Sequence, residues 1–165
     1  MRIKEKSHYR WSIQMNDQDI QEMTEVISRQ SFGRPFRHRA YFNHRLRTTG
    51  GRYMLAPHNI EINYKQFEKF GEQAVIDIIK HELCHYHLHL ERKGYQHRDK
   101  DFKALSKQVG APRYCTPVQS YAERVNYVYQ CKKCGVKFHR IRRVATRRRV
   151  CGKCGGRLKL VEGRK

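Results

Sequence analysis

Apolar residues recur at close to the helical period in one long stretch of the chain, from about Glu72 to Lys93. The stretch contains neither proline nor glycine, and polar residues fill most positions between the apolar ones. Such a stripe covers one face of a helix and leaves the other face to solvent. The pattern therefore predicts a long, half-buried helix. Its apolar positions are Val75, Ile76, Ile79, Leu83, Tyr86 and Leu90.

Shorter elements are expected on both sides of this helix. Asn16 or Asp17 can cap a first helix, which ends near Gly33, and a last helix spans residues 100–109. The first carries an apolar face of Ile20, Met23, Val26 and Ile27, and the last turns Phe102 and Leu105 inward.

Three short strands are expected ahead of the long helix. They cover residues 41–46, 53–55 and 59–63, where aromatic and branched apolar residues gather. Glycines 50 and 51 permit a turn that joins the first two strands. We therefore expect a small antiparallel sheet on which the long helix packs.

The long helix carries His81-Glu82-Leu83-Cys84-His85. Four residues separate the two histidines, so both imidazoles lie on one helical face, one turn apart, and can reach a single metal ion. Glu82 lies beside that face. This is the pattern of a zinc peptidase, in which zinc lowers the pKa of its water to about 7 and the carboxylate serves as general base.

Three other interpretations of this motif stay open. The motif can be a chance match in a chain with ten histidines. It can hold a structural zinc ion, although a structural site would not need Glu82. It can also belong to a zinc hydrolase that acts on a non-peptide bond.

A catalytic zinc ion needs a third protein ligand, and we favour His97. Gly94 offers a left-handed helix end after which His97 can return to the ion. An acidic residue nearby is the alternative, from Glu91, Asp99 and Asp101. His87 points off the shared face, and the Cβ of His89 lies about 12 Å along the axis from that of His81.

Charge is concentrated in the last quarter of the chain. The formal net charge is +21, and residues 127–165 hold 14 Lys and Arg against one acid. Such a field predicts a polyanionic partner, with nucleic acid ahead of an anionic membrane. A solvated basic tail is the alternative. The candidate nucleic-acid-binding residues are Arg140, Arg142, Arg143, Arg147, Arg148 and Arg149.

Four cysteines of this basic segment form two Cys-x-x-Cys pairs, Cys131 with Cys134 and Cys151 with Cys154. Their spacing predicts a structural zinc site with four thiolates, a zinc ribbon. The glycine after each pair permits the tight turn by which N–H groups approach the thiolates. Tyr127, Tyr129 and Phe138 can stack on bases or form the small core of the module. Cys84 is most simply a small packed residue.

No run of apolar residues is long enough to span a membrane, and the first residues lack the apolar core of a signal peptide. We therefore expect a protein of the cytoplasm or, in a nucleated cell, of the nucleus. We also expect it to act as a monomer.

With these residues in hand, the chain resembles the SprT-like family of zinc metalloproteases, which includes the DNA–protein crosslink protease Spartan. The resemblance covers nearly the whole chain. In the family a Gly-His segment supplies the third ligand, whereas here His97 follows Gln96. The motifs that carry the resemblance are Phe42-Asn43-x-Arg45-Leu46, Gly50-Gly51-x-Tyr53, Ile60-Glu61-Ile62-Asn63, residues 81–85 and the cysteine pairs.

Together these observations predict an α+β protein with a small zincin-like metalloprotease core, made of helices and a short antiparallel sheet. This core is expected over residues 1–126, with a basic four-cysteine zinc ribbon over residues 127–165. The resemblance implies one catalytic zinc ion, with Glu82 as general base, and DNA-linked proteins as substrates. The competing hypothesis is a nucleic-acid-binding or transcription-associated zinc-ribbon protein with an idle histidine site. Glu82 separates the two, because only a peptidase needs it.

Overall fold

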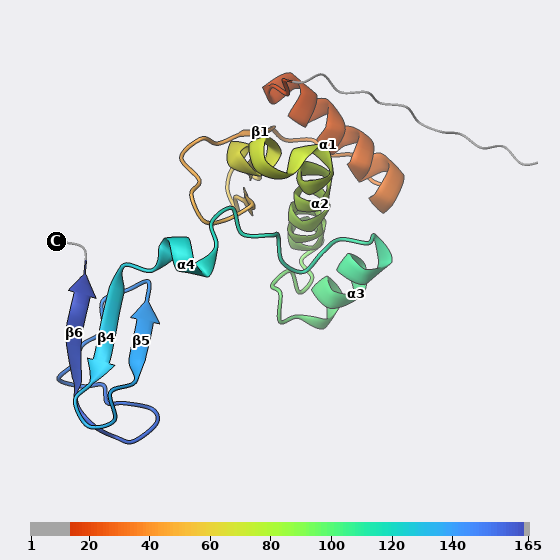
Figure 1. The fold of residues 1–165 in the computed structure, drawn as a ribbon. Helices are drawn as coiled ribbons and strands as arrows, with labels where there is room; N and C mark the ends of the chain where they lie inside the picture. The colour runs from red at the N-terminus through yellow and green to blue at the C-terminus, as the bar shows by residue number, and fades with distance from the viewer. Residues whose placement is uncertain (1–13, 164–165) are drawn as a thin grey trace, which may run out of the picture. The chain divides into compact units, whose positions relative to one another are not determined.

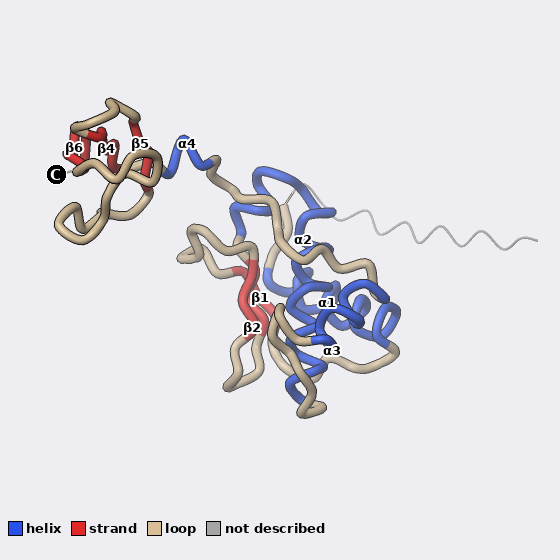
Figure 2. The backbone as a smooth tube through the Cα atoms, turned by 90° about the horizontal axis from the view of Figure 1, so that it is seen from below, coloured by secondary structure: helices blue, strands red, loops and turns tan. Residues whose placement is uncertain are grey.

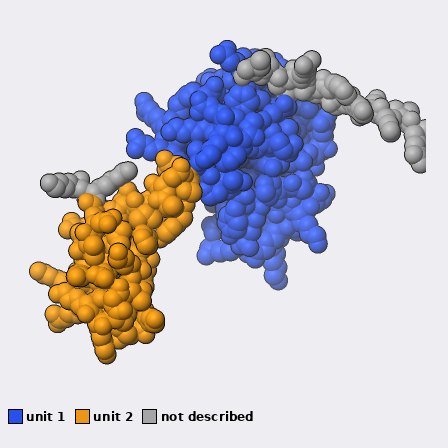
Figure 3. All heavy atoms as spheres, viewed as in Figure 1, with its two compact units in different colours: residues 1–118 blue, residues 119–165 orange. Residues whose placement is uncertain are grey.

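The computed structural model describes residues 14–163 of the 165-residue chain. The chain divides into two compact units, Met1–Val118 and Gln119–Lys165 (Figure 3). The module boundary expected at residue 126 falls within the second unit, just before its first strand. Each unit has its own sheet and its own candidate metal site.

The first helix of unit 1, α1 (Asp17–Phe32), follows the sequence signals at both ends. The side chain of Asn16 accepts hydrogen bonds from the N–H groups of Gln18 and Asp19, and the Asp19 carboxylate accepts one from the Asn16 N–H. Gly33 ends the helix in the left-handed conformation, with φ of 66°. Ile20, Met23 and Ile27 face the core as expected, whereas Val26 is only half-buried.

The sheet of unit 1 contains β1 (Ala40–Phe42), β2 (Gly51–Tyr53) and β3 (Ile60–Ile62). Its order is β1-β3-β2, with β1 parallel and β2 antiparallel to β3. The expected hairpin between the first two strands is therefore wrong. The sheet is mixed rather than wholly antiparallel, because only the β2–β3 pair is antiparallel. The central strand is the most buried of the three, and both neighbours pair with it rather than with each other.

The long helix, α2 (Tyr64–Leu90), begins earlier than its apolar pattern and is kinked at Gly71, whose φ of 74° is not helical. The expected Gly94 cap is wrong. The helix ends at Leu90, and Arg92 takes the left-handed conformation with φ of 57°. Gly94 is needed for a different reason: a Cβ there would lie 2.8 Å from the Cβ of Asp99.

The core of unit 1 lies between the sheet, α1 and the second half of α2 (Figures 1 and 2). A smaller cluster forms where α3 (Lys100–Gln108) packs on α2, through Phe102, Cys84 and Leu88. Phe102 is buried as expected, Leu105 is half-buried, and Cys84 is the packed residue that the sequence indicates. This packing holds the end of α2 and the loop after it in place.

Unit 2 contains α4 (Tyr121–Arg124), β4 (Tyr127–Cys131), β5 (Lys137–Arg140) and β6 (Leu158–Gly163). Its antiparallel sheet has the order β5-β4-β6. Among its described residues only Val128, Tyr129, Cys131 and Cys151 are buried. Unit 2 therefore has a very small core.

No helix among residues 14–163 is both long and apolar enough to cross a membrane. The cytoplasmic or nuclear location and the monomeric state stay predictions.

Candidate metal centres

The structure brings His81, His85 and His97 together. The first two come from consecutive turns of α2, and His97 comes from the loop between α2 and α3. Their Nε2 atoms lie 2.9 Å apart between His81 and His97, 3.1 Å between His85 and His97, and 3.2 Å between His81 and His85. Three nitrogens on a tetrahedral zinc ion lie about 3.3 Å apart. These three residues could therefore hold one metal ion.

Hydrogen bonds fix the orientation of two of the rings. Nδ1 of His81 donates to the carbonyl oxygen of Pro112 at 2.8 Å, and Nδ1 of His85 donates to that of Tyr95 at 2.6 Å. A neutral ring whose Nδ1 carries the proton has an unprotonated Nε2. Two such nitrogens cannot bond to each other, whereas a shared cation accepts the lone pairs of both. The donor set fits a zinc ion.

The imidazoles are also poised to be neutral. Burial, together with the neighbouring His81, lowers the pKa of His85 to about 4. Burial also lowers the pKa of His81 and of His97. Metal ligation requires the neutral form, so the protein interior favours the binding-competent state at neutral pH.

Glu82 lies beside the three histidines and is 7% exposed. Burial raises the pKa of its carboxyl to about 8, and a hydrogen bond with the backbone of Tyr53 opposes the shift. Gly51 of β2 approaches this side chain closely, since a Cβ there would lie 3.1 Å from Cγ of Glu82. A cation on the imidazoles would favour the ionised carboxylate.

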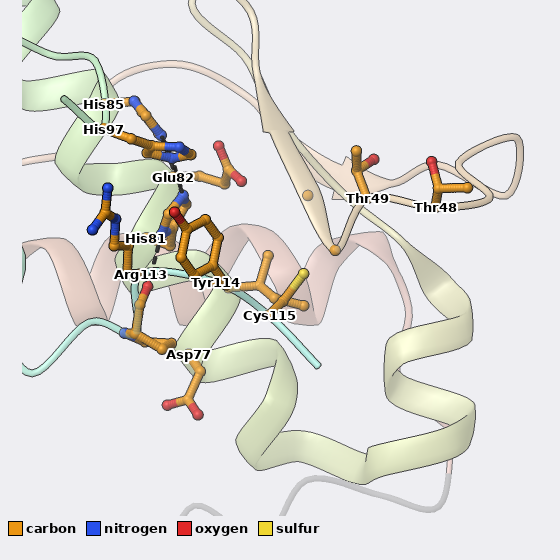
Figure 4. A pocket seen from close by; sticks show the side chains of 14 residues that line it. Thr48, Thr49, Asp77, His81, Glu82, His85, His97, Arg113, Tyr114 and Cys115 are labelled. Atoms are coloured by element: carbon orange, nitrogen blue, oxygen red, sulfur yellow. Dashed lines mark hydrogen bonds between the residues drawn. The ribbon is translucent and has the colours of Figure 1, made fainter. Parts of the chain in front are cut away.

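These groups line a cleft of about 350 Å³ in unit 1 (Figure 4). One wall is residues 48–51, ahead of and within β2, and the other is residues 112–115, which follow α3. Cys115 packs against the first wall, because a Cβ at Gly50 would lie 2.5 Å from its Sγ. Residues 112–115 reach the site only because the chain folds back after α3. No local sequence pattern indicates that they belong to it.

The other histidines of unit 1 within residues 14–118 make contacts away from the cluster. His87 is buried and its Nε2 lies 2.9 Å from Oγ of Ser28. His89 and His58 both contact the hydroxyl of Tyr53, at 2.7 Å. His38 bonds Tyr86, and His44 packs on Tyr64. None of them joins the metal cluster among the described residues.

The four cysteines gather in unit 2 and could hold a second metal ion. Sγ of Cys131 lies 3.5 Å from that of Cys154, and Sγ of Cys134 lies 3.7 Å from that of Cys151. Sulfurs on a tetrahedral zinc ion lie about 3.8 Å apart, whereas a disulfide brings them to about 2 Å. All four thiols are free.

The cysteine site is built from two similar turns. Gly135 and Gly155 follow the second cysteine of each pair with φ of 73° and 69°. N–H groups approach Sγ of Cys131, at 3.3 Å from Lys133 and 3.5 Å from Cys134. The bond from Cys134 is the main reason why the pKa of the Cys131 thiol is lowered to about 6. The turn at Cys131 therefore favours its thiolate, the form that binds metal. For Cys154 a hydrogen bond from the backbone of Gly156 lowers the pKa of the thiol, but hydrogen bonds with the other cysteine side chains outweigh it and raise the pKa to about 12.

The candidate arginines of unit 2 are all exposed. A cavity of about 650 Å³ is lined by four of them, Arg140, Arg142, Arg143 and Arg149, while Arg147 and Arg148 do not line it. Tyr129 belongs to the core, because it is 2% exposed and its hydroxyl accepts a hydrogen bond from the Val144 N–H at 2.9 Å. Phe138 is half-buried beneath the guanidinium of Arg140.

Comparison with known proteins gives the family. The SprT-like family model matches residues 20–124. The chain is 65% identical over 147 residues to "Protein SprT-like" of Staphylococcus saprophyticus, covering 89% of this chain and 97% of the relative. It is 61% identical over 151 residues to the protein of that name from Staphylococcus epidermidis, covering 92% and 100%. No solved structure matches, so the zincin-like description of the core stays a prediction. The match across most of unit 1 and both relatives show that the chain belongs to the SprT-like family.

Proposed function

We propose that the chain is a zinc-dependent metallopeptidase with its active site in the cleft of unit 1. The observation that carries the proposal is the convergence of three imidazole Nε2 atoms beside a buried carboxylate, Glu82, in an open cleft. Neither the cleft nor Glu82 is needed to hold a structural ion. Both are needed for hydrolysis, which requires access for a substrate and a group that moves a proton.

The residues divide the work as follows. His81, His85 and His97 would hold zinc, which supplies a Lewis acid and lowers the pKa of water to about 7. Glu82 takes a proton from the attacking water as the water oxygen bonds to the carbonyl carbon. The C–N bond then breaks, and Glu82 passes the proton to the leaving nitrogen. The products are a carboxylic acid and an amine, which become a carboxylate and an ammonium ion at neutral pH.

The loop carbonyls of Pro112 and Tyr95 keep the ligating atoms in place. Each accepts the Nδ1–H of one imidazole, which fixes the ring and its tautomer. Backbone carbonyls from two different loops therefore set the orientation of the His81 and His85 rings. A substrate that binds in the cleft would lie against one of these loops, at residues 112–115.

We further propose that unit 2 binds nucleic acid and that the substrates are DNA-associated proteins. Support comes from the four guanidinium groups around the cavity in unit 2 and from the high density of basic residues in the same segment. Phosphates would bind the guanidinium groups. The same features favour the second candidate function, a zinc-ribbon nucleic-acid-binding protein without catalysis.

The test is cleavage of a basic protein substrate, with and without single-stranded DNA, by the wild type and by Glu82→Gln. A loss of at least a hundredfold in rate by a variant that keeps its metal supports the metallopeptidase, since about that much is expected from a general base. Stimulation of the wild type by DNA would assign unit 2 its role. If neither protein cleaves while both bind DNA, the second candidate function replaces the first.

A further inference from the structure

Tyr114 is an exposed aromatic residue in the wall of the cleft. It is 68% exposed, and its ring stands edge-on to that of His97, with centroids 6.2 Å apart. The guanidinium of Arg113 lies 5.3 Å from the centre of the Tyr114 ring. Figure 4 shows the hydroxyl end of Tyr114 pointing toward His81, His97 and Glu82 rather than away from the cleft.

The hydroxyl of Tyr114 makes no hydrogen bond with any residue between 14 and 163. Other tyrosines of the chain use theirs within the fold. Those whose hydroxyls bond protein groups are Tyr41, Tyr53, Tyr86, Tyr121 and Tyr129. The Tyr114 hydroxyl is therefore a donor that the fold itself does not use, at the edge of the candidate active site.

Few other side chains of the cleft can donate a hydrogen bond to a substrate. Nδ1 of His81 and of His85 donates to a backbone carbonyl. Figure 4 shows Thr48 and Thr49 on the opposite wall, away from the histidines. The remaining donors are Nδ1 of His97, the Cys115 thiol, the Arg113 guanidinium and the Tyr114 hydroxyl. Cys115 packs on Gly50 and His97 is a candidate ligand, so the Tyr114 hydroxyl is the donor that can point at the cluster from outside it.

We propose that Tyr114 is a catalytic residue of the proposed peptidase, on which this inference rests. Its O–H donates a hydrogen bond to the substrate carbonyl oxygen as water adds to the carbonyl carbon and that oxygen gains negative charge. The phenol keeps its proton, and the proton of the attacking water goes to Glu82. The bond strengthens as charge develops, so it lowers the barrier more than it tightens substrate binding.

Arg113 is a positioning residue in this arrangement. Its guanidinium against the ring restricts the directions that an exposed tyrosine could otherwise sample. The two neighbouring residues therefore act as one unit, in which the cation holds the ring and the hydroxyl reaches the substrate.

The test compares Tyr114→Phe with Tyr64→Phe in steady-state cleavage of a basic protein. Tyr64 also has a hydroxyl that bonds no described residue, but it lies outside the cleft. Tyr114→Phe should lower kcat by about a hundredfold, as loss of one oxyanion donor does, with KM within about twofold and the metal content unchanged. Tyr64→Phe should match the wild type. A kcat of Tyr114→Phe within about twofold of the wild type would overturn the inference.

A second measurement uses a phosphinic peptide, whose tetrahedral phosphorus carries oxygens where the oxyanion forms. Tyr114→Phe should weaken its inhibition by about the same factor as kcat/KM, because both depend on the same hydrogen bond. Unchanged inhibition would contradict a catalytic role even if kcat fell. A wild type that cleaves while Tyr114→Phe cleaves equally well overturns this inference alone, whereas an inactive wild type overturns the proposed function itself.

Discussion

The two candidate metal sites use opposite designs. The histidine site of unit 1 has three ligands, an adjacent carboxylate and an open cleft, whereas the cysteine site of unit 2 has four ligands. Four thiolates complete a tetrahedral shell, and three imidazoles leave one position for another group. The number of candidate ligands and the presence of a base therefore distinguish the site that we propose for catalysis from the site that we propose for structure.

The two units also differ in the size of their apolar cores. Unit 1 has a continuous apolar core of helices and sheet, so we expect it to fold without metal. Among the described residues of unit 2, only Val128, Tyr129, Cys131 and Cys151 are buried. We therefore expect unit 2 to need a metal ion on its cysteines for folding.

The largest expected effect is the unfolding of unit 2 when one of its cysteine ligands is replaced. Cys131→Ser should abolish protection of the unit 2 amides from hydrogen exchange and leave unit 1 protected, because a structural zinc ion contributes about 10–16 kcal/mol to a small module. His97→Ala is the matched control, since it removes a ligand of the other site and should leave unit 2 protected. Protected unit 2 amides in Cys131→Ser would mean that the apolar core alone suffices.

A smaller effect is expected when the loop that carries His97 is altered. Gly94→Ala should weaken metal binding at the histidine site by about 10–100-fold, as loss of outer-shell support does. The added methyl would meet Asp99 at 2.8 Å and shift the loop that carries Tyr95 and His97. Titration with a competing chelator measures this affinity.

Gly152→Ala, in unit 2, is the matched control for the glycine-to-alanine substitution, because a Cβ at Gly152 meets nothing within 4 Å. It should leave the affinities of both sites unchanged. If Gly94→Ala also binds metal as the wild type does, the loop does not position the third ligand.

Lowering the pH should destabilise unit 1 through protonation of Glu61 in β3. Burial opposes ionisation of this carboxyl, but hydrogen bonds from Asn43, Arg52 and Tyr41 outweigh it and lower the pKa. A lowered pKa stabilises the fold fully above the ordinary value of 4.5, and the contribution is lost as pH falls through the lower, folded value.

The measurement is the free energy of unfolding of the wild type and Glu61→Gln against pH. At pH 7 the variant should be less stable by about 1.5–3 kcal/mol, the range for hydrogen bonds to a charged group. The difference should shrink below pH 4.5, where the wild-type carboxyl takes up a proton. A difference that stays constant down to about pH 3 would show that the charge of Glu61 does not matter.

The smallest effect concerns the arginines of unit 2. Replacing Arg142 and Arg143 by Ala should reduce the slope of log affinity for single-stranded DNA against log salt by about 1.4, or about 0.7 for each phosphate that is no longer neutralised. Arg37→Ala with Arg39→Ala, in unit 1, is the control and should leave the slope unchanged. Binding that is indifferent to salt would remove nucleic acid as the partner.

Much of the site follows from local sequence. The four-residue step of His81 and His85 and the Cys-x-x-Cys pairs are short-range patterns, and the structure brings these residues together as expected. Outside the site, Asn16 is the one of the two expected residues that caps the first helix. His97 also joins the cluster, although Arg92 rather than Gly94 makes the turn.

What the sequence did not indicate depends on distant parts of the chain. The sheet order could not be predicted, because β1 and β2 each pair with β3 and strands of three residues carry little register information. The cleft wall at Tyr114 and the carbonyl of Pro112 could not be predicted either. Their place depends on how the chain after α3 returns to α2, and no local pattern records that return.

The most direct test is the metal content of the intact chain by native mass spectrometry, with cleavage assayed on the same samples. We expect two zinc ions in the wild type, one in His85→Ala without cleavage, and one in Cys151→Ser with cleavage of a free protein substrate retained. One zinc ion in the wild type, or cleavage that survives in His85→Ala, would contradict this expectation.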